Sequence, residues 1–103
     1  MATPVSGPAT VTSVTPGNAV IAIAANQAGG YIVNPASASD QGLATAEVLY
    51  VNQVQSAGLT GNGTTIVLQP GQSYSVIPST TTPVTVASAS ASHNFTAVQW
   101  PTP

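Results

Sequence analysis

The side chains that could carry acid–base or metal chemistry in this chain are Asp40, Glu47 and His93. General acid–base or glycosidase chemistry needs a pair of carboxylates, and the 103 residues contain only these two acids. We expect Glu47 in a strand and Asp40 in the loop before it, so nothing in the sequence sets their separation. We therefore interpret both as solvated surface acids.

His93 could act as a base toward one of the many serines. A catalytic triad also needs an acid that orients the imidazole and donors that hold an oxyanion, and no Gly-x-Ser-x-Gly elbow is present. We interpret His93 as a strand-edge residue. Neither a close spacing of metal ligands nor a calcium-loop pattern occurs. The sequence thus predicts no catalytic residue, no bound metal and no cofactor, and favours a structural or binding protein over an enzyme.

Three further patterns have an ordinary structural interpretation. Gly29-Gly30 follows a predicted strand but lacks the rest of a phosphate-binding fingerprint, so we expect a turn there. Asn62-Gly63-Thr64 and Asn94-Phe95-Thr96 match the glycosylation acceptor pattern. No secretory signal accompanies them, so we treat both as chance matches.

Four aromatic side chains could form a platform on which a sugar stacks. They lie on separate predicted strands, which is more typical of core or interface anchors. These residues are Tyr31, Tyr50, Tyr74 and Trp100.

Charge is almost absent from the chain, since Lys plus Arg is 0 and charged residues make up 2% against about 25% in ordinary proteins. Without a cation, the chain cannot bind nucleic acid by releasing counterions or be drawn to anionic membranes. No apolar run approaches the roughly 18 residues of a membrane span, so we expect a soluble chain. Cysteine is absent, which excludes disulfides and thiolate metal sites.

Short segments rich in Val, Ile and Thr alternate with turn residues along the chain. This pattern predicts an all-β fold, a small antiparallel β-sandwich (jelly-roll-like) or barrel of about seven to eight strands. The predicted strands are 10–14, 20–23, 31–33, 47–52, 64–69, 72–77, 83–91 and 94–100. We expect the strand at 20–23 to be buried.

Turn chemistry is clearest in the second half of the chain. Gly61-Asn62-Gly63 supplies the positive backbone angles of a tight hairpin loop, and Pro70-Gly71 fits the centre of a type II turn. Asn34-Pro35 marks a further turn. In the strand at 72–77 the alternation places Tyr74 and Val76 on one face.

The segment 40–55 is ambiguous between helix and strand. Asp40 could cap a helix whose apolar face would be Leu43, Ala46, Tyr50 and Val54. Gly42 and the valines oppose a helix, and the alternation at 47–52 suits a strand. We favour the strand.

The chain divides into an extended N-terminal arm at 1–17 and a single β-domain at 18–103 with a short C-terminal tail. Free soluble sheets use charged residues to keep their edges apart, and this chain has almost none. We therefore expect its edges and faces to be covered by other subunits. An unusual isolated domain is the alternative.

The run Gly-Asn-Gly-Thr-Thr-Ile-Val-Leu-Gln-Pro-Gly-Gln-Ser-Tyr-Ser-Val-Ile-Pro at 61–78, with 82–86 and 93–100, resembles head decoration or cement proteins of tailed bacteriophages. The resemblance covers roughly 47–100. It implies a subunit that binds the outer capsid surface at the contacts between major capsid proteins. The resemblance also implies that copies of the chain associate as a dimer or trimer. Such a protein is made in the bacterial cytoplasm, ends in the virion and has no catalytic residues.

A carbohydrate-binding β-module, associated with a phage tail or a cell surface, is the alternative function. It would gather several aromatic residues on one exposed face, so the placement of the four aromatic residues distinguishes the two functions.

Overall fold

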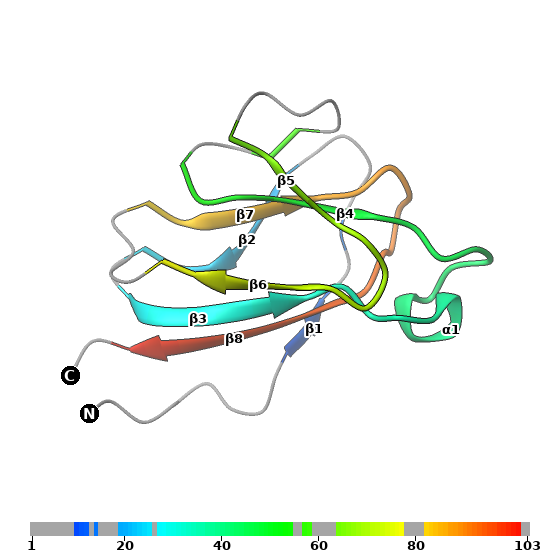
Figure 1. Ribbon diagram of the computed structural model, residues 1–103, viewed down its shortest axis with the longest axis horizontal. Helices are drawn as coiled ribbons and strands as arrows, with labels where there is room; N and C mark the ends of the chain where they lie inside the picture. The colour runs from blue at the N-terminus through cyan, green and yellow to red at the C-terminus, as the bar shows by residue number, and fades with distance from the viewer. Residues whose placement is uncertain are drawn as a thin grey trace.

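The computed structural model describes residues 10–12, 14, 19–25, 27–54, 57–58, 64–77 and 82–101. These residues form two four-stranded antiparallel sheets stacked on each other, with a one-turn helix at one end (Figure 1). The elements are β1 (Thr10–Thr12), β2 (Val20–Ile23), β3 (Gln27–Val33), α1 (Ala38–Gln41), β4 (Leu49–Asn52), β5 (Ile66–Leu68), β6 (Ser73–Val76), β7 (Val84–Ala87) and β8 (Phe95–Pro101). The predicted all-β sandwich is confirmed.

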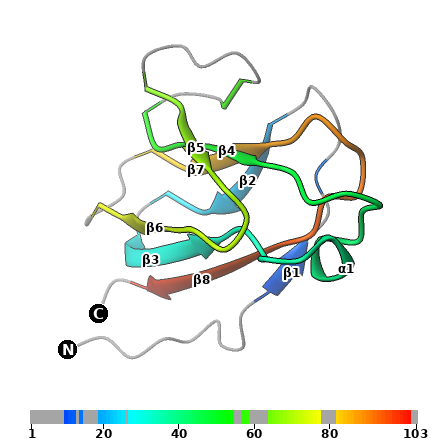
Figure 2. The ribbon, with the colours of Figure 1, turned by 45° about the vertical axis from the view of Figure 1, so that its right-hand side comes forward.

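The strand order is β1-β8-β3-β6 in one sheet and β2-β7-β4-β5 in the other. This is the order of a jelly roll, in which the chain passes between the sheets at every connection except β4–β5. Figure 2 shows the same two layers after a turn of 45° about the vertical axis. Among the described strands, each sheet has two edge strands with no further strand beside them, and the consecutive strands β5 and β6 form one such edge in each sheet.

The core lies between the sheets and consists mainly of valine and other aliphatic residues, with Phe95 as its largest side chain. Side chains alternate along each strand, so one face of each sheet contributes to the core. In β6 the predicted alternation is confirmed, because Val76 is buried and Tyr74 packs against the core, while Ser73 and Ser75 are exposed. The core residues are Val14, Ile23, Ile32, Leu49, Val51, Leu68, Val76, Val84, Val86, Phe95 and Ala97.

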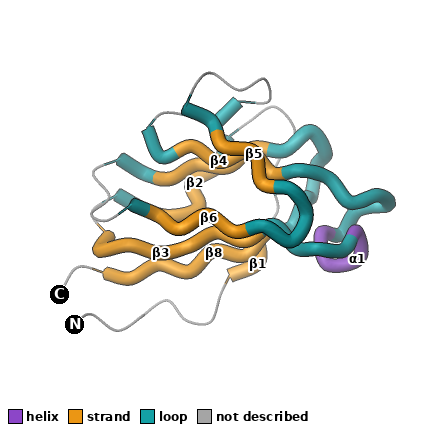
Figure 3. Tube along the Cα trace, viewed as in Figure 1, coloured by secondary structure: helices purple, strands orange, loops and turns teal. Residues whose placement is uncertain are grey.

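The predicted turn at Pro70-Gly71 is confirmed. The Gln72 amide donates to the Gln69 carbonyl at 3.0 Å, and Gly71 has φ 89°, as the third position of a type II turn requires. This turn joins β5 to β6 and so links the two sheets, as the tube in Figure 3 shows. The predicted hairpin loop at 61–63 lies outside the described residues.

For the ambiguous segment, β4 at Leu49–Asn52 confirms the preference for a strand. No periodic pattern predicts α1, because a single helical turn is too short to show one. Ser37, not Asp40, caps this helix, since its hydroxyl accepts from the Asp40 amide at 3.1 Å. Gly42 ends the helix with φ 74°.

The expected turn at Gly29-Gly30 is wrong, because both residues lie inside β3. The strand contains a bulge between Gln27 and Gly29. At Gly30 a Cβ atom would lie 2.3 Å from the carbonyl oxygen of Val98 on β8. The glycine is therefore needed for the close approach of two strands, which a sequence pattern does not reveal.

Two other predictions change at the start of the chain. β2 is an edge strand in which Ile23 is buried but Ile21 is exposed. The prediction of a buried strand at 20–23 is therefore wrong for the face of β2 that carries Ile21. Within the predicted arm at 1–17, β1 pairs with β8 and Val14 is in the core. These described residues of the arm therefore belong to the β-sandwich.

Candidate functional site

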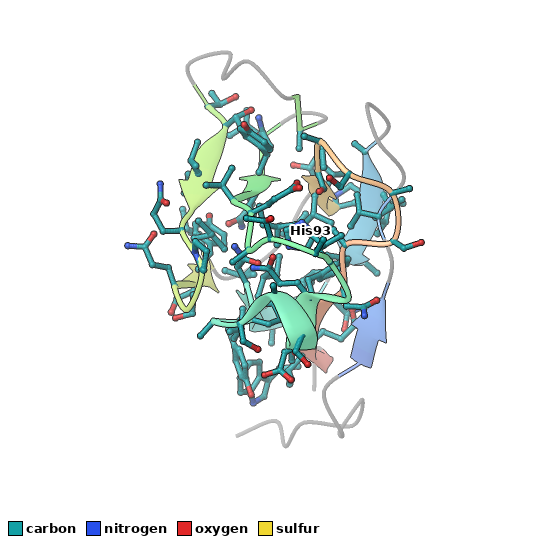
Figure 4. All side chains as sticks on the ribbon, turned by 90° about the vertical axis from the view of Figure 1, so that its right-hand side faces the viewer. His93 is labelled. Atoms are coloured by element: carbon teal, nitrogen blue, oxygen red, sulfur yellow. The ribbon has the colours of Figure 1, made fainter. Side chains whose placement is uncertain are left out.

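A cluster of buried and half-buried polar side chains lies at the end of the sandwich that carries α1. It consists of Asn34, Gln41, Glu47, Ser88, Ser90 and His93, which we call the His93 cluster. Its members come from the segment after β3, from α1, from the segment before β4 and from the connection between β7 and β8. Figure 4 looks onto this end of the molecule and shows His93 among these segments.

Asn34 is fully buried at the centre of the cluster. Its Nδ2 donates to the carbonyl oxygens of Glu47 and Leu68, each at 2.9 Å. Its Oδ1 accepts from Gln41 Nε2 at 3.0 Å and bonds His93 Nε2 at 2.9 Å. Because both Nδ2 hydrogens have carbonyl acceptors, the orientation of this amide is fixed.

The protonation of His93 follows from that orientation. Oδ1 of Asn34 can only accept, so the neutral imidazole carries its proton on Nε2. His93 Nδ1 then accepts from the Ser88 hydroxyl at 2.8 Å, and Ser88 Oγ accepts from the Ser90 amide at 3.2 Å. Burial lowers the pKa of His93, an effect that the nearby Glu47 carboxylate partly opposes. The cluster therefore holds His93 as a neutral imidazole.

Gln41 and Glu47 connect the helix to the start of β4. Gln41 Nε2 donates to Pro35 O at 2.8 Å and lies 3.1 Å from Glu47 O, and its Oε1 accepts from the Glu47 amide at 2.8 Å. The Glu47 carboxylate accepts from the Ser90 hydroxyl at 2.6 Å through Oε2. Its Oε1 is buried with no hydrogen-bond partner among the described residues.

The three residues singled out in the sequence have different environments. Asp40 is exposed on α1, as expected for a solvated acid. Glu47 is half-buried and bonded to Ser90, so its interpretation as a solvated surface acid is wrong. His93 is fully buried, so its interpretation as a strand-edge residue is also wrong. The cluster brings Glu47 and His93 together and leaves Asp40 at the surface.

The cluster contains a hydroxyl beside an imidazole, the pair used in nucleophilic catalysis. Ser88 and His93 are both fully buried, so the Ser88 hydroxyl has no path to a substrate in this structure. Within the described ranges, no three His, Asp or Glu side chains are grouped to hold a metal ion, and no helix is long and apolar enough to span a membrane. The geometry suits a structural role for the cluster.

Sequence reasoning missed Asn34, Gln41 and Ser88 because amide and hydroxyl side chains are abundant in this chain. The only usable signal was the Asn34-Pro35 dipeptide, which we interpreted as a turn. The partners of Asn34 include Leu68 and His93, which are remote in sequence. Only the folded chain brings them together.

The four aromatic residues do not gather on one face. Tyr31 and Trp100 lie on the outer face of the β1-β8-β3-β6 sheet, with ring centroids 5.8 Å apart and planes tilted by 56°. Tyr74 packs against the core, and its hydroxyl donates to Gln53 Oε1. Tyr50 lies on β4 in the other sheet, opposite Val67 and Ala87.

The open edges of β5 and β6 form an uncharged surface. Its exposed residues, which we call the β5–β6 edge, are Ile66, Val67, Ser73, Ser75 and Ile77. The Gln53 side chain closes the edge at Ile77, because Gln53 Nε2 donates to Ile77 O at 2.7 Å and Gln53 Oε1 accepts from Ile77 N at 2.9 Å.

The bonds from Gln53 show that the backbone groups of Ile77 point away from β3. In an antiparallel strand, every second residue directs its backbone N–H and C=O to the same side of the strand. The N–H and C=O groups of Ser73 and Ser75 therefore also point away from β3. β6 therefore offers a short row of backbone donors and acceptors at the β5–β6 edge.

The His93 cluster and the β5–β6 edge are the two features of the described residues that could serve a function. The first is largely buried, and the second is exposed in the part of the chain that the structure describes. Comparison of the chain with models of known protein families, with curated proteins and with solved structures found no match.

Proposed function

We propose that this chain is a non-enzymatic structural subunit that pairs with neighbouring protein chains through the β5–β6 edge, as a capsid decoration protein of a tailed bacteriophage. The observation that carries the proposal is the uncharged, partly apolar character of this open edge. Natural sheets protect their free edges with charged side chains, above all lysine, and this chain contains no Lys or Arg. Such an edge is suited to pairing with a strand of another chain.

The mode of pairing that fits this edge is strand addition. An extended segment of a partner would bond the outward backbone groups of Ser73 and Ser75 and cover the apolar side chains of Ile66, Val67 and Ile77. No ionic group of this chain would lose its water in the process, so the desolvation cost is low.

The proposed partners are the major capsid protein and further copies of the chain on the virion exterior. Support comes from the resemblance of residues 61–78, which include β5 and the whole of β6. Jelly rolls occur in viral capsid proteins but also in lectins and cupins, so the fold alone does not select a function.

A carbohydrate-binding module is less well supported. Only Tyr31 and Trp100 share an outer face, and their tilt of 56° prevents both rings from lying flat against one sugar surface. A tilted pair with its ring centroids 5.8 Å apart is an ordinary packing contact between two aromatic rings.

A charged residue placed on the edge tests the proposal. Ser75→Lys puts a charged side chain on the exposed face of the edge strand β6, and lysine is the residue with which natural sheets keep other chains from their edges. Ser39→Lys is the matched control, because Ser39 is equally exposed but lies on α1. Circular dichroism and thermal unfolding establish that both variants fold like the wild-type chain.

The wild-type chain and each variant are expressed in the cells in which the protein is naturally made. Virion-sized particles from these cells are then isolated on a density gradient. We expect wild-type chain and Ser39→Lys to sediment with virion-sized particles, and Ser75→Lys to be reduced at least about tenfold in that fraction. The proposal is wrong if the wild-type chain remains at the top of the gradient. Binding to polysaccharide that is lost in Trp100→Ala would instead identify a carbohydrate-binding module.

A further inference from the structure

His93 is the only side chain of this protein that can gain a positive charge near neutral pH, since the chain has one His and no Lys or Arg. It is also fully buried and joins segments that are distant in sequence. Through Asn34 it connects to the residues after β3 and to α1, and through Ser88 it connects to the end of β7.

Protonation of His93 is incompatible with the hydrogen bond that Nδ1 accepts from Ser88, whereas the bond from Nε2 to Asn34 would remain. A proton on Nδ1 would point at Ser88 Oγ, which donates its own hydrogen to that nitrogen in the neutral state. Ser88 would have to rotate and accept, and its hydrogen would lose its present acceptor inside the protein.

The surroundings offer one charged group to compensate. Glu47, from the segment before β4, is the only ionisable residue in the cluster besides His93, and the partners supplied by the other segments are neutral, namely Asn34, Gln41, Ser88 and Ser90. Asp40 lies on α1 but is exposed to solvent. Desolvation of His93 outweighs the attraction of Glu47, so the closed cluster disfavours the imidazolium.

We propose that the His93 cluster is an acid-sensitive latch, in which protonation of His93 releases the α1 end of the sandwich, residues 34–47 and 88–94, while the two sheets stay paired. The latch is independent of the proposed assembly. A released His93 has an ordinary pKa of about 6.5, whereas burial lowers its pKa in the closed state. The latch is therefore fully closed above about pH 6.5, and its opening equilibrium rises by up to about tenfold for each pH unit below that value.

Nuclear magnetic resonance can observe the latch directly, because a single imidazole gives an unambiguous signal. We expect the Nε2–H tautomer and a pKa below about 6.5. Amide exchange, corrected for its intrinsic pH dependence, reports opening at two sites. These are the Asn94 amide, which donates to Gln41 O at 2.8 Å, and the Ser92 amide, which donates to Val14 O at 2.9 Å.

As the pH falls below about 6.5 we expect protection of the Asn94 and Ser92 amides to fall by up to about tenfold per pH unit, with protection in the centre of β3 unchanged. The Nδ1–H tautomer, a pKa at or above 6.5, or equal loss of protection across β3 would overturn the proposal.

Two variants separate titration of His93 from general weakening of the cluster. His93→Gln keeps an amide that can donate toward Asn34 but cannot be protonated near neutral pH. In this variant the corrected exchange rate of the Asn94 amide should no longer depend on pH, whether or not that rate at neutral pH differs from the wild-type rate. Asp40→Asn removes the exposed acid and should leave the wild-type pH dependence unchanged. A pH dependence that persists in His93→Gln also overturns the proposal, and the titration of wild-type His93 gives a result even if this variant does not fold.

Discussion

In this protein the hydrogen-bonding partners of buried polar groups are mostly neutral amide and hydroxyl side chains. Asn34 alone bonds two carbonyls, one amide and one imidazole, and Gln41 ties α1 to the backbone of Glu47. Neutral partners are cheaper to bury than ions, which matches a chain with 2% charged residues. The neutral tautomer of His93 belongs to the same arrangement.

Gln41→Ala should reduce the free energy of unfolding by about 2–3 kcal/mol, because it leaves the Glu47 amide and the Pro35 carbonyl without their observed partner. Alanine is a good helix former, so the loss would not come from α1 itself. Gln69→Ala is the matched control, since Gln69 is exposed and contributes backbone bonds to its turn. It should change the stability by less than about 0.5 kcal/mol.

Urea unfolding followed by tryptophan fluorescence measures both values. Equal effects of the two substitutions would show that the cluster does not contribute to stability.

At the scale of strands and turns, backbone geometry decides several features that composition does not. Gly30 lets β3 approach β8, and Gly71 allows the turn between β5 and β6. Ser37 and Gly42 limit α1 to a single turn. Gln53 acts in place of a neighbouring strand at Ile77.

Gly30→Ala should destabilise the protein by about 2–3 kcal/mol, because the added methyl group would overlap the Val98 carbonyl and force β3 and β8 apart. Gly58→Ala adds the same methyl group where, apart from the adjoining residues of the chain, no described residue has an atom within 4 Å. It should be neutral or raise the stability by up to about 1 kcal/mol.

Thermal unfolding of the two glycine variants beside the wild-type chain gives the comparison. If Gly30→Ala unfolded like Gly58→Ala, the close approach of β3 and β8 would be wrong.

The whole molecule is a jelly roll whose edges lack the charged residues that normally protect them. Its two acids lie on α1 and in the His93 cluster, away from the β5–β6 edge. Burial of neutral groups, and not attraction between ions, is therefore the expected source of affinity for a partner.

If the chain binds the proposed partner, this association should change by less than about twofold between about 50 mM and about 1 M sodium chloride, because the chain contributes almost no charge that salt could screen. Sedimentation of labelled chain with isolated particles across this range measures the effect. A steep loss of binding with salt would contradict pairing through the uncharged edge.

The sequence could predict the fold class because it depends on local features that each segment carries by itself. Alternation in 72–77, the Pro70-Gly71 turn and the choice of strand at 47–52 all follow from neighbouring residues. The same local reasoning was wrong at Gly29-Gly30, where the constraint comes from Val98 on another strand.

The near absence of charge, the all-β class and most strand positions were therefore properties of the sequence alone. The tertiary structure decided the strand order, the hydrogen bonds from Gln53 to the backbone of Ile77 and the burial of His93. The physical reason is distance along the chain, because Asn34 and His93 are 59 residues apart and their hydrogen bond exists only when the sheets are stacked.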